Sequence, residues 1–183
     1  MPLSDYFRVE PAHDPRQVAN DLWNFELAET ASAEDWKLYR ETLVEQYKLY
    51  VEMADRISAR RGVANTFFLT LNTAILTVIG VFWDSQPMVS PWVLLFPLFI
   101  LIAECVLWFQ IIRSYRQLNS GKWNVVAAME QRLPASPWYR AEWAALGKGV
   151  EPRKYTPLTH VEKWTPLLFA VAYGGGFVAA ITL

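Results

Sequence analysis

The sequence contains few of the residues that catalysis and metal binding use. It has one cysteine, Cys105, and two histidines in 183 residues. No disulfide can therefore form within the chain, and neither histidine has a second His or a Cys close enough to suggest a metal site. No motif typical of zinc proteases, redox dithiols, serine hydrolases, phosphate-binding loops or dinucleotide sites is present. We therefore expect no enzyme, no metal and no cofactor, and the net charge of −1 gives no reason to expect nucleic acid.

Lysine and arginine are absent from three apolar stretches, residues 62–83, 91–112 and 164–183. Each stretch is about as long as the ~20 residues that a helix needs to cross a hydrocarbon core of about 30 Å. A buried helix of a small soluble domain would be shorter and would have a polar face. The sequence therefore predicts an all-α integral membrane protein with three transmembrane helices and a helical cytoplasmic portion. Residues 84–90 would form the external loop between the first two spans.

The basic residues indicate how the chain is oriented. Of the 17 lysines and arginines, eight precede the first span and nine lie between the second and third. The short loop 84–90 and the C-terminus have none. Basic residues are retained on the cytoplasmic side of a membrane. This distribution predicts a cytoplasmic N-terminus, a cytoplasmic helical segment at 113–163 and an external C-terminus.

A long amphipathic helix is predicted at 32–61, after an N-terminal cytoplasmic arm at 1–31. Ser32 followed by Asp35 is a start signal, and apolar residues then recur at spacings of three and four. Such a stripe must pack either against residues 122–146 of the same chain or against neighbouring copies, and we favour a ring or coiled-coil contact between copies. A break is expected at 119–121 because of the Asn-Ser-Gly sequence there. The residues assigned to the contact are Trp36, Tyr39, Leu43, Tyr47, Tyr50 and Ile57.

Glu104 is the one ionisable residue well inside a span. A charge at that depth is costly, so the side chain is protonated, paired or facing a wet cavity. It lies nine residues before Arg113, and Asn72 lies eleven residues after Arg61, which places both at a similar depth and makes a hydrogen bond between them feasible. Glu104 and Asn72 are either a proton or cation site or an interhelical contact worth about 1 kcal/mol, and we favour the contact.

Threonines at 66, 70, 73 and 77 lie within a narrow strip of the first span. Thr66, Thr70, Thr73 and Thr77 could line a pore in an oligomer. Threonines in membrane helices more often bond the carbonyls of their own helix or a neighbouring helix, and we favour that interpretation.

Small residues in the third span have the spacing that permits close helix packing, at Ala172, Gly175, Gly176 and Ala180. Packing is favoured over ligand binding, because the glycines lie at membrane depth and no Lys-Ser/Thr follows them. Beside the first span, Arg60 and Arg61 could hold anionic lipid head groups. Retention of positive charge in the cytoplasm would explain them equally well.

Three segments together resemble a known family, the RipA-like octameric membrane proteins of bacteria. They are 54–75 (ADRISARRGVANTFFLTLNTAI), 108–134 (WFQIIRSYRQLNSGKWNVVAAMEQRLP) and 157–166 (PLTHVEKWTP). The resemblance implies a bacterial inner-membrane protein with three spans and two cytoplasmic regions that assembles as a homo-octamer. It implies no reaction and no catalytic residues. The long helix before the membrane also resembles the SLATT-type membrane effectors, although their usual two spans count against that assignment.

These observations favour a non-catalytic homo-oligomer with a structural or regulatory role, which self-associates through the 32–61 helix and the spans. The alternative is an ion channel or pore-forming effector, in which the threonine strip would face an axis and Glu104 would tune passage. A membrane enzyme is disfavoured because no acid–base pair or nucleophile stands out beyond the bilayer. The expected partners are other copies of the chain and membrane lipids.

Overall fold

Every regular element in the part of the chain that the structure describes is a helix, which confirms the predicted all-α class. The computed structural model describes residues 15–24, 28, 30–85, 90–149, 151–156 and 158–182. The predicted arm at 1–31 is thus described only in part, and residues 86–89 of the predicted external loop lie outside the described residues. The elements are α2 (Pro15–Leu22), α3 (Ala33–Ser85), η1 (Pro91–Leu94), α4 (Leu95–Glu130), η2 (Pro137–Glu142), α5 (Trp143–Ala145), η3 (Gly147–Gly149), α6 (Leu158–Glu162) and α7 (Trp164–Thr182).

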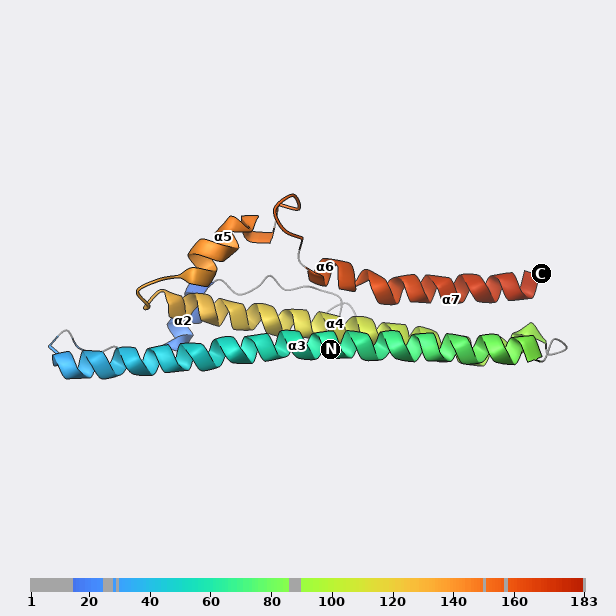
Figure 1. Cartoon of the computed structure of the whole chain (residues 1–183), viewed down its shortest axis with the longest axis horizontal. Coiled ribbons are helices and arrows are strands. Elements are labelled where there is room, and N and C mark those ends of the chain that lie inside the picture. Colours follow the sequence, from blue (N-terminus) through green and yellow to red (C-terminus); the bar gives the residue numbers. More distant parts are fainter. Residues whose placement is uncertain are drawn as a thin grey trace. The chain divides into compact units, whose positions relative to one another are not determined.

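Helix α3 is one unbroken helix that contains both the predicted amphipathic helix and the predicted first span (Figure 1). It begins with the predicted cap. The Ser32 backbone N–H and hydroxyl both donate to Asp35 Oδ2, at 3.1 and 2.7 Å, and the Asp35 N–H donates back to Ser32 Oγ at 3.2 Å. These bonds lower the pKa of Asp35, so the cap forms above the ordinary carboxyl pKa and is lost as the pH falls through the lowered value. At 1.5 Å per residue α3 is about 80 Å long, far more than a bilayer of about 30 Å requires.

Helix α4 continues to Glu130, so the break predicted at 119–121 is wrong. A glycine inside a helix costs only about 1 kcal/mol relative to alanine. The helix gains more than that from residues 126–130, all of which are buried. At its other end, η1 precedes the α-helix, and Pro97 lies in the first α-helical turn. Proline has no N–H to donate, and the first turn of a helix tolerates it best because the N–H groups there have no partner in the preceding turn of the α-helix.

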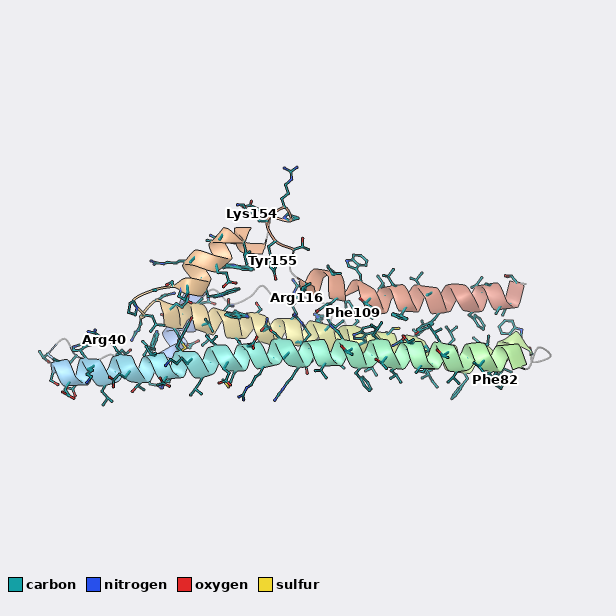
Figure 2. All side chains as sticks on the ribbon, viewed as in Figure 1. Arg40, Phe82, Phe109, Arg116, Lys154 and Tyr155 are labelled. Atoms are coloured by element: carbon teal, nitrogen blue, oxygen red, sulfur yellow. The ribbon has the colours of Figure 1, made fainter. Side chains whose placement is uncertain are left out.

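Three of these helices, α3, α4 and α7, are long and apolar enough to cross a membrane. Most of their apolar side chains are exposed on the surface of the single chain, where they can contact lipid. Figure 2 shows such side chains projecting from all three helices, with Phe82 near the C-terminal end of α3. The chain divides into two compact units, one of 1–56 with 117–155 and one of 57–116 with 156–183. The second unit contains all three predicted spans, and we call it the membrane unit; the first is called the helical unit.

The helical unit is built around a buried carboxyl group, Glu130, which is 1% exposed. Its Oε1 accepts hydrogen bonds from the Tyr47 hydroxyl and the Trp138 N–H, and its Oε2 accepts one from the Tyr139 N–H, each at 2.9 Å. Desolvation, followed by the proximity of Glu130, raises the pKa of Tyr47 to about 12, so this phenol keeps its proton and remains the donor. One side chain thus joins α3, the end of α4 and the start of η2.

Aromatic and cationic side chains complete the helical unit. Lys122 Nζ lies 4.5 Å from the centre of the Tyr50 ring, and the Arg132 guanidinium lies 3.9 Å from that of Trp23. Arg132 also donates to the Tyr39 hydroxyl at 3.0 Å. The Lys122–Tyr50 and Arg132–Trp23 contacts are of the cation–π type, which is worth roughly 0.5–2 kcal/mol depending on desolvation.

Glu130→Gln is expected to destabilise the helical unit by about 2 kcal/mol or more. The substitution replaces an acceptor oxygen with an NH₂ donor that faces donors, and hydrogen bonds to charged groups are each worth about 1.5–3 kcal/mol. Unfolding of the purified protein in mild detergent, followed by tryptophan fluorescence, measures the change. Glu45→Gln is the control, because Glu45 is exposed and its ion pair with Lys48 is exposed too, and it should shift stability by less than about 0.5 kcal/mol. Equal shifts for both variants would contradict this account of Glu130.

Candidate functional site

The three spans meet at a polar cluster within the membrane unit. Asn72 of α3 has 0% exposure, although it lies in the middle of an apolar helix. Its Nδ2 donates to Glu104 Oε1 of α4 and to its own helix at the Phe68 carbonyl, both at 2.8 Å. Its Oδ1 accepts a hydrogen bond from the Tyr173 hydroxyl of α7. The hydrogen bond predicted between Asn72 and Glu104 is thus present, and Asn72 joins all three spans.

A second polar contact lies closer to the predicted cytoplasmic end of the spans. Trp108, which is 1% exposed, donates from Nε1 to Asn65 Oδ1 at 3.0 Å. Its ring stacks on Phe68, with centroids 5.6 Å apart and planes 13° apart. Asn65 precedes Asn72 by seven residues on α3, while Trp108 follows Glu104 by four on α4. The two pairs therefore hold the antiparallel helices in one register, as expected where polar groups in hydrocarbon have no water to bond.

Apolar packing surrounds the polar cluster. Leu101, Cys105 and Tyr173 are buried together, and apolar side chains of all three spans pack around them. The single cysteine therefore fills space in the core rather than facing solvent. The residues packed against this group are Ile75, Ile79, Leu98, Ile102, Phe169 and Ala170.

The threonine strip lies away from this core. Thr66, Thr70, Thr73 and Thr77 are all exposed on the surface of the single chain. The hydroxyls of Thr66, Thr73 and Thr77 donate to the carbonyls of Gly62, Leu69 and Thr73, respectively, at 2.8–3.1 Å. Three of the four therefore have their hydrogen-bond donor satisfied by their own helix, which is the usual behaviour of such residues in membrane helices.

The small residues of α7 differ in their exposure. Ala172, Gly175 and Gly176 are exposed and Ala180 is half-buried, whereas Tyr173 faces the core. A Cβ added to Gly175 or Gly176 would meet no atom within 4 Å. Among the described residues, no close approach is therefore made at Gly175 or Gly176, and a contact with another copy stays a prediction.

The amphipathic stripe on α3 is occupied within the helical unit. Leu43 is buried, and Tyr39, Tyr47 and Tyr50 contact Arg132, Glu130 and Lys122. Internal packing, the alternative that the sequence left open, therefore covers these four residues. Trp36 packs edge-on against Tyr39, with centroids 6.0 Å apart, and Ile57 is 9% exposed. The large apolar side chains that remain exposed on this part of α3 are Leu38, Leu49 and Met53.

The two arginines at the start of the first span have different surroundings. Arg61 Nε lies 3.2 Å from Glu162 Oε2, and both side chains are largely buried, at 13% and 22% exposure. This ion pair links α3 to α6, just before the third span. Arg60 is exposed and lines a groove on the surface of the membrane unit. Of the two arginines predicted to bind lipid head groups, Arg60 is therefore the one whose side chain is exposed.

No group of three or more metal-ligating side chains is present among the described residues. Glu104 is the only carboxyl group of the intramembrane cluster, and Asn72 and Tyr173 are neutral partners. Such a cluster offers hydrogen bonds between helices.

Four residues that make these contacts were not predicted from the sequence to do so. Tyr173 lies ten residues after Lys163, a depth close to that of Asn72, so the comparison that paired Asn72 with Glu104 would also have found it. The same comparison would have paired Asn65, four residues after Arg61, with Trp108, five residues before Arg113. Glu130 had no such signal, because its partners are backbone N–H groups of η2, whose position depends on the tertiary structure.

The fold and the cluster define an all-α membrane protein with three spans joined by intramembrane hydrogen bonds. The chain belongs to the octameric membrane protein family (8xMP), whose family model matches residues 44–182. This match extends over all three spans and confirms the resemblance to a family of octameric membrane proteins. No curated protein and no solved structure matches the chain.

Asn72→Leu is expected to lower the stability of the membrane unit by about 1–2 kcal/mol, because it leaves Glu104 and Tyr173 without their partner in hydrocarbon. Titration of the purified protein from mild detergent into SDS, monitored by circular dichroism, gives the change. Thr73→Val is the matched control on the same helix, since the Thr73 hydroxyl bonds only its own backbone. A loss for Asn72→Leu no greater than that for Thr73→Val would refute the role of Asn72.

Proposed function

We propose that the protein is a non-catalytic homo-octamer of the bacterial inner membrane with a structural or regulatory role. Its partners are other copies of itself within a lipid bilayer, and nucleic acid is not among them. Membership of the octameric family supports the self-association. The absence of Lys and Arg from 84–90 and from the C-terminus supports an orientation with the N-terminus and 113–163 in the cytoplasm and the C-terminus outside.

The contacts between copies are assigned to surfaces other than the packed stripe of α3. That stripe is covered by the same chain, through bonds such as Tyr47 to Glu130. Leu38, Leu49 and Met53 remain exposed outside the predicted span, at 64%, 61% and 43%. Large apolar side chains exposed together on one helix favour burial against a protein surface.

The non-conducting role is supported by the hydrogen bonds of the polar side chains in the spans, most of which are made within the protein. Asn72 uses both its amide nitrogen and its oxygen in contacts between or within helices. Thr66, Thr73 and Thr77 bond the carbonyls of α3 itself. An ion pathway needs polar groups that replace water around the passing ion. Here Asn72 joins the three helices, and the donors of three threonine hydroxyls are used within α3 itself.

A channel is the second candidate, and one observation favours it. The four threonines are exposed, whereas Asn72 is buried, so the strip lies on a different face of α3 from the contact with the other two spans. In a ring of copies this face would meet a neighbour, the lipid or the central axis. A strip of hydroxyls facing the axis would provide a polar lining even with its donors used, because each oxygen retains acceptor capacity.

Ion flux through vesicles that contain the purified octamer distinguishes the two functions. The proposed role predicts vesicles as tight as protein-free ones, with several salts and at several pH values. Parent protein, Glu104→Gln and Thr73→Leu are compared, and the mass of each oligomer is checked before reconstitution. Flux through the parent that falls in either variant would overturn the proposal and establish a conducting path.

A further inference from the structure

A groove runs along the surface of the membrane unit between α3 and α4. It has a volume of about 510 Å³. Its apolar walls come from Val63, Ala64, Phe67 and Phe68 on α3 and Ile111 on α4. All of these residues belong to the two stretches that lack Lys and Arg, so this part of the groove faces hydrocarbon rather than water.

The polar residues of the groove are confined to one end. Arg60 precedes the first apolar stretch and Tyr115 follows the second, and the two helices run in opposite directions, so both side chains lie at the same membrane boundary. Phe67 lies seven residues further along α3, about 10 Å deeper at 1.5 Å per residue. The groove therefore changes from cationic to apolar with depth, which complements a phospholipid whose head group is anionic and whose acyl chains lie deeper in the leaflet. Tyrosine at this level is typical of the interface between head groups and acyl chains.

The charge of this end is positive. No acidic side chain lines the groove, and Arg60 has no ion-pair partner in the part of the chain that the structure describes. The adjacent Arg61 differs, because Glu162 neutralises it at 3.2 Å. A guanidinium presents two parallel N–H groups to phosphate oxygens, and a phenol hydroxyl adds a further donor.

We propose that this groove binds one anionic phospholipid of the leaflet on the Arg60 side. The phosphate contacts Arg60 and Tyr115, and an acyl chain lies over Val63, Phe67 and Ile111. This inference is independent of whether the octamer conducts ions. It explains why the first of two consecutive arginines remains exposed while the second is paired within the protein.

Native mass spectrometry of the full-length oligomer tests the proposal. The protein is exchanged into detergent micelles that contain either phosphatidylglycerol, which is anionic, or phosphatidylcholine, which is zwitterionic. We expect about one phosphatidylglycerol retained per subunit and little phosphatidylcholine. Arg60→Gln should weaken phosphatidylglycerol binding about fivefold, the effect of one basic residue near an anionic surface.

Two further variants separate the groove from general charge and from folding. Arg116→Gln removes an exposed charge close to the same boundary but outside the groove, and should leave retention unchanged within about twofold. Val63→Trp fills the groove without changing charge and should abolish retention while the oligomer keeps its mass. Equal losses for Arg60→Gln and Arg116→Gln, equal retention of the two lipids, or a Val63→Trp oligomer that keeps both its mass and its lipid would each overturn the proposal.

Discussion

The arrangement of the membrane unit depends on one amide side chain. Lipid provides no hydrophobic force between helices, since acyl chains are as apolar as leucine, so packing and hydrogen bonds must hold the spans together. Asn72 has no exposure and bonds Glu104 on α4 and Tyr173 on α7. The Asn65–Trp108 bond then sets the register of α3 and α4. Leu101 and Cys105 form the apolar core together with Tyr173, the residue that bonds Asn72. Polar residues that would be costly alone in a bilayer thus stabilise one another.

The helical unit, which lies outside the predicted spans, is also held together by one buried polar side chain. Glu130 is as deeply buried as Asn72, and its oxygens are bonded by Tyr47 and by two backbone N–H groups. Leu43, Tyr39, Tyr47 and Tyr50 of the stripe on α3 pack within the chain. In the proposed homo-octamer, neighbouring copies would then meet at exposed surfaces such as Leu49 in the helical unit and the glycines of α7 in the membrane unit. An octamer built from such surfaces keeps each chain's own contacts intact.

The sequence was sufficient for the features that depend on composition and depth. The absence of Lys and Arg located the spans, and counting residues from Arg61 and Arg113 paired Asn72 with Glu104. The Ser32–Asp35 cap was equally predictable, because it is a local exchange of hydrogen bonds. Features that depend on tertiary packing were not predictable in this way. Gly121 was expected to break a helix that burial of 126–130 continues, and the choice between internal and intermolecular packing of the stripe required the positions of Lys122, Glu130 and Arg132.

Asn72 couples the first span to the third as well as to the second. A double-mutant cycle that combines Asn72→Leu with Tyr173→Phe measures this coupling directly through the unfolding free energies of the parent, both single variants and the double variant. If the hydroxyl–amide bond holds α7 to α3, the double variant will lose about 1 kcal/mol less than the sum of the single losses. Losses that add within about 0.3 kcal/mol would show that the two side chains do not interact, and would contradict the account of how the three spans are held together.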